Sequence, residues 1–138
     1  MATIANLKSY KAGQGPWPVP GKPEFMSFEY DFAKDGGAVG EYPIFKAGKA
    51  MQIRLAQIIV DTLCTSGGSA TLGAGKASDL AGIIGATAVA SLTAGAVING
   101  ASPDASHVLA KDDIVYAAIG TAALTAGKCR FVFEVLPV

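Results

Sequence analysis

From Phe25 onwards, aromatic and polar residues alternate along the chain, which is the period of a β-strand. Successive side chains of a strand point to opposite faces, so one face collects the aromatic residues Phe28, Tyr30 and Phe32 and the other the polar residues Ser27, Glu29 and Asp31. The sequence Asp35-Gly36-Gly37 predicts a turn after this strand. A second short strand follows from Glu41 to Phe45, in which Pro43 indicates an edge position.

The segment from Met51 to Leu63 fits two periodicities. Its apolar residues make a helical stripe, and they also fit a strand with one phase slip, as a β-bulge produces. The run QIIVDTLCT is rich in β-branched residues, and no side-chain N-cap precedes the segment. We therefore predict a bulged strand.

Beyond Thr65 the chain breaks into short pieces separated by glycine. These pieces predict short strands at Ser69–Leu72, Ala86–Leu92, Ala96–Ile98 and His107–Leu109, with a turn at Thr93-Ala94-Gly95 and a short helix or turn at Ser78–Ala81. Ile114–Ile119 and Cys129–Leu136 predict the last and strongest strand pair, joined by a hairpin connection over Gly120–Gly127. Many short strands with regular turns predict an all-β fold, an antiparallel β-sandwich or jelly roll.

The first 24 residues have a different composition. Prolines at every second position remove backbone donors, which excludes both a helix and a central strand. We predict an extended, Pro/Gly-rich N-terminal arm over residues 1–24 and a β-sandwich domain over residues 25–138.

Trp17, the only tryptophan of the chain, lies between two prolines of this arm. A large aromatic side chain on a stiff, polyproline-like stretch suits an anchor for a groove, and equally suits packing onto the core of its own domain. The lysines of the arm precede any acidic residue, which favours an acidic docking surface. The candidate partner-binding residues are Trp17, Pro16, Pro18, Pro20, Lys8, Lys11 and Lys22.

Composition and charge exclude several classes of function. The chain is 51% hydrophobic but rich in small residues, and its 11 basic and 11 acidic side chains cancel. A protein that binds nucleic acid or a membrane surface through positive charge would not be neutral, so we expect no direct nucleic-acid or membrane partner. The uncharged segment Leu80–Pro103 is built from small residues between Asp79 and Asp104, so we reject it as a membrane span. The N-terminus has no signal-peptide core, which predicts synthesis and use without secretion.

The residues offer little material for catalysis. The segment Ala70–Ala77 approaches a phosphate-binding loop but has alanine at its first glycine position and at its hydroxyl position, so we interpret it as a structural turn. His107 lies near Asp104 without a nucleophile motif, and we expect it at the surface or an interface. We therefore predict no enzymatic activity, no catalytic residues and no cofactor.

The other polar clusters also have structural explanations. Asp112-Asp113 suits a turn into the next strand, and the carboxylates of Glu29 and Asp31 suit a solvated strand face better than a metal site. A basic cluster without acidic neighbours, Lys46, Lys49 and Arg54, suits a solvated rim or an acidic partner. Cys64 and Cys129 are expected to be free, buried thiols.

The order of segments in the second half of the chain resembles that of a known class of viral proteins. A strand at Met51–Leu63, a Ser/Gly/Thr-rich hairpin through Gly67, Gly68 and Leu72, and the small-residue segment Thr87–Asn99 precede the run Asp113–Glu134. Together they resemble small structural proteins of tailed bacteriophages, in particular capsid decoration (cement) proteins with a β-sandwich fold. The resemblance covers residues 40–138 and rests on turn and strand patterns.

This resemblance implies a virion protein that is made in the host cytoplasm and bound to the capsid exterior. Such a protein, often a homotrimer, binds the major capsid protein and holds neighbouring subunits of the shell together. The arm would then bind a neighbouring chain, either a second copy or the major capsid protein. The alternative is a phage tail or host-recognition protein with glycan-binding loops, which exposed aromatic residues and paired carboxylates in the loops would favour.

Overall fold

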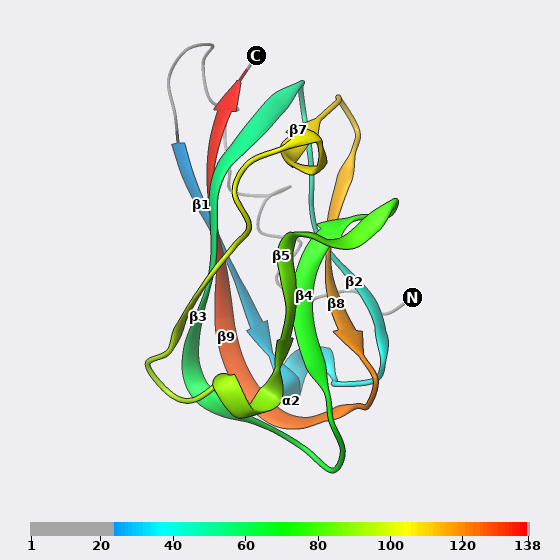
Figure 1. Cartoon of the computed structure of the whole chain (residues 1–138), viewed down its shortest axis with the longest axis vertical. Helices are drawn as coiled ribbons and strands as arrows, with labels where there is room; N and C mark the ends of the chain where they lie inside the picture. Colours follow the sequence, from blue (N-terminus) through cyan, green and yellow to red (C-terminus); the bar gives the residue numbers. More distant parts are fainter. Residues whose placement is uncertain (1–23, 138) are drawn as a thin grey trace.

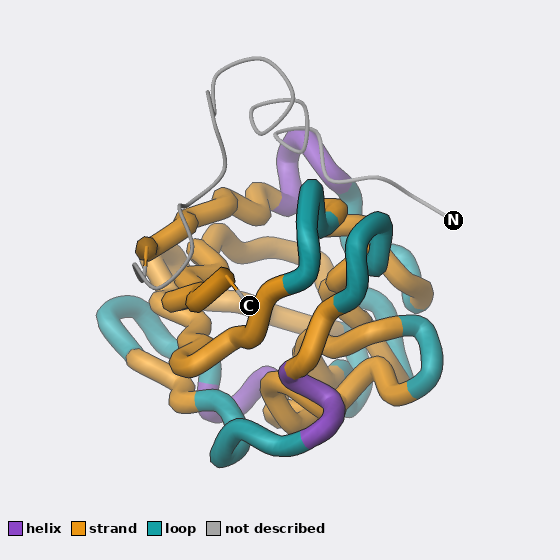
Figure 2. The backbone as a smooth tube through the Cα atoms, turned by 90° about the horizontal axis from the view of Figure 1, so that it is seen from above, coloured by secondary structure: helices purple, strands orange, loops and turns teal. Residues whose placement is uncertain are grey.

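The chain folds into two facing antiparallel β-sheets, and the computed structural model describes residues 24–137 (Figure 1). Sheet A has the strand order β1-β9-β3-β6, with β7 also paired to β3, and sheet B has the order β2-β8-β4-β5. Figure 2 shows the described chain from above, with strands making up most of it and loops connecting them. The all-β sandwich predicted from the alternating pattern is confirmed.

The bounds of the strands follow the alternation of apolar residues. Sheet A consists of β1 (Glu24–Asp31), β3 (Met51–Ser66), β6 (Val97–Asn99), β7 (Val108–Leu109) and β9 (Leu124–Pro137). Sheet B consists of β2 (Gly40–Lys46), β4 (Thr71–Lys76), β5 (Asp79–Ala88) and β8 (Ile114–Gly120). The helical segments are short: α2 (Phe32–Asp35), η2 (Val89–Ser91) and η3 (Ala105–His107).

Two of the predictions about individual strands are confirmed. β3 covers the ambiguous segment as a strand, and its register against β9 shifts between Ile53 and Leu55 and again after Val60, as bulges require. β2 lies at the edge of sheet B, where the missing donor of Pro43 breaks no ladder on its outer side. Phase slips in an apolar pattern therefore mark bulges here.

The predicted pairing of the last two strands is wrong. β8 belongs to sheet B, between β2 and β4, whereas β9 belongs to sheet A, between β1 and β3. The predicted hairpin connection is shorter than Gly120–Gly127, because β9 already begins at Leu124. Thr121, with a φ of 70°, lies in the connection that passes from one sheet to the other. Two strong consecutive strands can therefore lie in opposite layers.

Several predicted boundaries also need correction. The strand predicted at Ala86–Leu92 ends at Ala88, and η2 follows from Val89. Of the helix or turn predicted at Ser78–Ala81, only Ser78 lies in a turn, because β5 begins at Asp79. Phe32 leaves the first strand to begin α2, because the Asp31 carboxylate caps the helix by accepting the N–H of Ala33 at 3.0 Å. Side-chain capping has overridden the period of the strand at this point.

The segment considered as a membrane span forms parts of β5, η2 and β6. Within residues 24–137, no helix is both long enough and apolar enough to cross a membrane.

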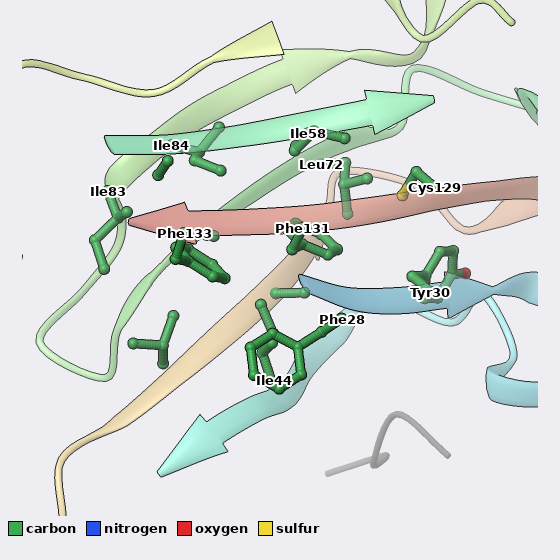
Figure 3. Close-up of a cluster of buried hydrophobic side chains, with 14 of the residues drawn as sticks. Phe28, Tyr30, Ile44, Ile58, Leu72, Ile83, Ile84, Cys129, Phe131 and Phe133 are labelled. Atoms are coloured by element: carbon green, nitrogen blue, oxygen red, sulfur yellow. The ribbon is translucent and has the colours of Figure 1, made fainter. Parts of the chain in front are cut away.

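Buried side chains from both sheets, among them Phe28 and Phe133 of sheet A and Ile44 of sheet B, form the core of the sandwich (Figure 3). Phe28 of β1 stacks on Phe45 of β2 with ring centroids 5.4 Å apart, and Phe133 of β9 meets Phe45 edge-on at the same distance. Tyr30 and Tyr42 make a T-shaped pair at 6.3 Å. Such pairs add about 0.5–1.5 kcal/mol each beyond the burial of their area. The ring contacts of the core therefore lie where β1 and β9 face β2.

The opposite side of the sandwich is closed by backbone hydrogen bonds. Gly100 donates its N–H to Ala56 of β3 at 2.7 Å, and Ala101 donates to Ile83 of β5 at 2.9 Å. A Cβ on Gly100 would lie 2.7 Å from the Ile83 carbonyl oxygen and 2.9 Å from that of Ala56. Only glycine allows the chain to pass this close to both sheets.

Two phenylalanines on β1 provide a test of this core. Phe28 is 3% exposed, whereas Phe25, on the same strand, is 65% exposed. Phe28→Ala should lower the free energy of unfolding by about 3–5 kcal/mol, because it removes a packed ring and leaves a cavity. Phe25→Ala should change it by less than about 0.5 kcal/mol. Urea unfolding of both variants checks this, and equal losses would contradict the inward orientation of Phe28.

A second prediction concerns alkaline pH. Burial raises the pKa of Tyr30, and that of the Cys64 and Cys129 thiols, above the ordinary values of 10.0 for tyrosine and 9.0 for cysteine. A raised pKa means that the stability contributed by these groups is complete below pH 9 and is lost as the pH rises towards the folded-state values. Urea midpoints should be flat from pH 7 to 8.5 and should fall above pH 9.

Tyr30→Phe provides the control for this pH series. The free energy of unfolding of this variant should be about 1 kcal/mol lower at pH 7, because the variant lacks the hydrogen bond that the Tyr30 hydroxyl donates to the Gly36 carbonyl. Above pH 10 its urea midpoint should fall less steeply with pH than that of the wild type, since one titrating group is gone. A steeper fall would contradict the assignment.

Candidate functional site

Exposed apolar side chains gather on the outer face of sheet A, the face turned away from sheet B. Among the described residues, large apolar side chains on this face are exposed at Phe25 (65%), Leu55 (39%), Val97 (50%) and Val108 (47%). They come from β1, β3, β6 and β7, so they span the width of the sheet. An apolar set of this kind marks a contact surface more often than an isolated exposed residue does.

The strand register explains why these residues meet on one face. Residues directly opposite in neighbouring strands share a face, and Glu134 of β9 is opposite both Phe25 and Leu55. Val97 is opposite Ile59, whose neighbours along β3 are buried. The bulge after Ile53 places Leu55 outside, because it shifts the phase of the strand by one residue.

Four of the charged residues on this face form ion pairs within the sheet, whereas Glu134, between Phe25 and Leu55, has no ion-pair partner among the described residues. Arg130 donates Nε and Nη2 to the two carboxylate oxygens of Asp61, at 3.1 Å each. Lys128 lies 3.4 Å from the Glu29 carboxylate. Exposed pairs contribute at most about 1 kcal/mol to stability, but they cancel each other's field. The face therefore combines exposed apolar residues with two ion pairs and the Glu134 carboxylate, and it suits a protein surface better than a polyanion.

His107 is expected at the surface or an interface, and the surface alternative is wrong because its side chain is buried within the chain. Its side chain is 1% exposed, its Nδ1 lies 3.2 Å from the Asp104 carboxylate, and its Nε2 meets no hydrogen-bond partner among the described residues. The short η3 helix turns the ring inward beside β5 and β3. A histidine enclosed in this way has no free path to a substrate.

The glycine-lysine segment that approaches a phosphate loop is a strand. β4 runs in extended form from Thr71 to Lys76 and pairs with β5 and β8, so its backbone N–H groups cannot surround an anion. Lys76 donates its ammonium group to the carbonyl of Val108 at 2.9 Å. The prediction that no phosphate site exists here agrees with this geometry, although the segment is a strand and not the predicted turn.

A cavity of about 370 Å³ lies beside the end of β4. Its walls are Lys76, Ala77, Ser78, Asp112, Asp113, Ile114 and Tyr116. Asp113 accepts the N–H of Ala110 at 2.9 Å, and Asp112, with a φ of 75°, lies 3.8 Å from the ammonium of Lys46. The two aspartates therefore form the predicted turn before β8. Asp112 of this turn is the acidic partner of Lys46. The sequence around Lys46 contains no sign of this contact, because the two residues are far apart in the chain.

The remaining candidates are mostly structural. Cys64 and Cys129 are buried and free, as predicted. Glu29 and Asp31 are engaged by Lys128 and by the N-terminus of α2, respectively. Residues 24–137 contain no group of three or more histidine, cysteine or acidic side chains arranged to hold a metal ion.

The predicted arm residues lie outside the described part of the chain. These are Lys8, Lys11, Pro16, Trp17, Pro18, Pro20 and Lys22. The apolar outer face of sheet A, by contrast, was missed by the sequence reasoning. Val97 and Val108 stand in mainly apolar stretches of the sequence, so no local pattern marks them as exposed, and the strand order is needed to bring them together.

No protein-family model matches this chain, and no curated protein matches it in sequence. Solved structures of two phage capsids contain chains of similar fold. A chain of the Cyanophage Pam1 capsid asymmetric unit matches with a TM-score of 0.61 and 16% identity, over 91% of this chain and 96% of its own length. A chain of the capsid of Ralstonia phage GP4 matches with a TM-score of 0.68 and 16% identity, over 99% of this chain and 97% of its own length. This protein therefore shares its fold, over nearly its whole length, with chains of two phage capsids.

Proposed function

We propose that this protein is a structural component of a tailed-bacteriophage virion, a decoration protein that binds the outside of the capsid. In this role it holds neighbouring subunits of the major capsid protein together. The observation that carries the proposal is the match to two phage capsid chains from end to end. Because nearly all of both chains aligns in each case, the likeness is to a whole small capsid component and not to one domain of a larger protein.

The outer face of sheet A supports this role. Its exposed apolar residues lie beside two closed ion pairs, Lys128–Glu29 and Arg130–Asp61, which a partner can cover without leaving those four charges unpaired. Four apolar side chains on four strands suit a broad and nearly flat partner, which a capsid surface offers. We therefore assign this face to the major capsid protein.

A purely structural role also agrees with the polar residues. His107 is enclosed beside Asp104, and both cysteine thiols are buried with raised pKa values, which keeps them protonated and unreactive. We propose that the protein has no catalytic activity and requires neither metal nor cofactor. A homotrimer is the proposed assembly, because a thin fold with many small residues gains apolar burial when copies share surface.

The capsid face can be tested by single substitutions. Val97→Asp and Val108→Asp should each weaken binding to capsids that lack this protein by about tenfold or more, because each places a charge in an apolar contact. Co-sedimentation with purified capsids measures the binding. Val39→Asp is the matched control, since Val39 is 57% exposed but lies between α2 and β2, off this face. Equal binding by all three variants would move the capsid contact to another surface.

The arm gives a second test of attachment. Deleting residues 1–23 should leave a folded domain, because β1 begins at Glu24, but should weaken its co-sedimentation with capsids. Trp17→Ala should reproduce a good part of this loss, as expected for an aromatic anchor that contributes about 2 kcal/mol. Circular dichroism of the truncated chain shows whether the sandwich remains. Undiminished decoration by the truncated chain would exclude the arm from attachment.

A further inference from the structure

The outer edge of β1 carries backbone groups that no other described residue binds. At the end of this strand, Asp31 donates its N–H to the carboxylate of Asp35 at 2.9 Å instead of to β9. The N–H and C=O of one residue in an antiparallel strand point to the same side, and the side alternates from residue to residue. The backbone groups of Phe25, Ser27 and Glu29, in step with Asp31, therefore point away from β9.

The other side of β9 gives the same assignment. Val60 of β3 donates its N–H to Ala96 at 2.9 Å, so its backbone groups face away from β9. Its register partner in β9, Cys129, therefore bonds to β1 on the opposite side, where it is paired with Tyr30. Tyr30 bonds inward, and its neighbour Glu29 bonds outward.

The other sheet edges in the described part of the chain are interrupted, whereas this one is regular. β2 contains Pro43 and a register shift, and β5 has two register shifts against β4. β6 and β7 are three and two residues long. β1 pairs with β9 over eight residues without a shift and contains no proline. A long regular edge is where a further strand can add.

The sequence that precedes β1 has the pattern of a strand that can pair on one side only. Prolines stand at positions 16, 18 and 20, and N–H donors remain at Gly15, Trp17, Val19 and Gly21. In an extended chain every second residue points its backbone groups to the same side, so all the remaining donors face one way and all the prolines the other. Its donors thus have the same two-residue spacing as the outward groups of β1.

We propose that residues 15–21 of a second copy of this chain add to the edge of β1 as an antiparallel strand. The donors of Trp17 and Val19 then face the outward groups of β1, and their side chains share the outer face of sheet A with Phe25. The prolines face away from β1 and leave the new edge without donors. Each β1 accepts one strand and no more, which keeps the assembly finite.

A neighbouring copy is favoured over the same chain by the entry to β1. Pro23 directly precedes the strand, which fixes its own φ near −65° and restricts Lys22 to extended conformations. A tight hairpin back onto β1 would need positive φ values at this point. Donation from copy to copy in one direction also closes into a ring, as a trimer requires. This inference deepens the proposed self-association and rests on it.

The only tryptophan of the chain provides the readout. In the isolated full-length protein, Trp17 emission should move to shorter wavelength and acrylamide quenching should fall as the concentration rises, together with an increase in mass by light scattering. Ser27→Pro removes one outward donor of β1 without touching the ladder to β9, and should weaken this association by about tenfold. Ser27→Ala, which keeps the N–H, should behave as the wild type.

Val19→Pro tests the same contact from the arm, where it cannot unfold the sandwich, and should also weaken the association. Protection of Trp17 in a monomer at every concentration would overturn the proposal in favour of pairing with the same chain. Protection that neither proline variant reduces, or no protection at all, would also overturn it. None of these measurements uses capsids, so their failure is distinct from a failure of capsid decoration.

Discussion

The structure depends on β9, the strand that is hydrogen-bonded on both sides by long neighbours. Its alternate residues Cys129, Phe131, Phe133 and Val135 are all buried, and its backbone groups alternate between β1 and β3. The two-residue period of this one strand therefore determines which residues of its neighbours face the core. It also determines which backbone groups of β1 remain on the open edge.

The features that depend on the local alternation of apolar and polar residues could be predicted from the sequence. The aromatic face of β1, the edge position of β2 and the bulged course of β3 all follow from residues that are near one another in the chain. The all-β sandwich followed from the number and length of such segments. What failed was the pairing of β8 with β9, because periodicity shows that a segment is a strand but not which layer it joins.

The candidate surface was beyond sequence reasoning for the same physical reason. Leu55, Val97 and Val108 come together only through register across sheet A, and that register depends on a bulge in β3 and on the close passage of Gly100. The burial of His107 likewise depends on contacts of η3 with β5 and β3. The residues next to His107 in the sequence do not indicate these contacts. The composition offers few reactive side chains, with one histidine and two cysteines, and the expectation of no catalytic residues stays a prediction.

The same alternation explains how this fold persists at low sequence identity. A strand needs apolar residues of suitable size at inward positions, whereas outward positions are constrained only where they meet a partner. Because inward and outward positions are constrained separately, two chains can share this fold at low identity. The match with a TM-score of 0.68 at 16% identity, found although no family model matches, agrees with this. In β1 the two roles fall on adjacent residues: Met26 and Phe28 pack the core, while Phe25 and Ser27 face outward. Changes at outward positions can therefore alter the partner while the fold remains.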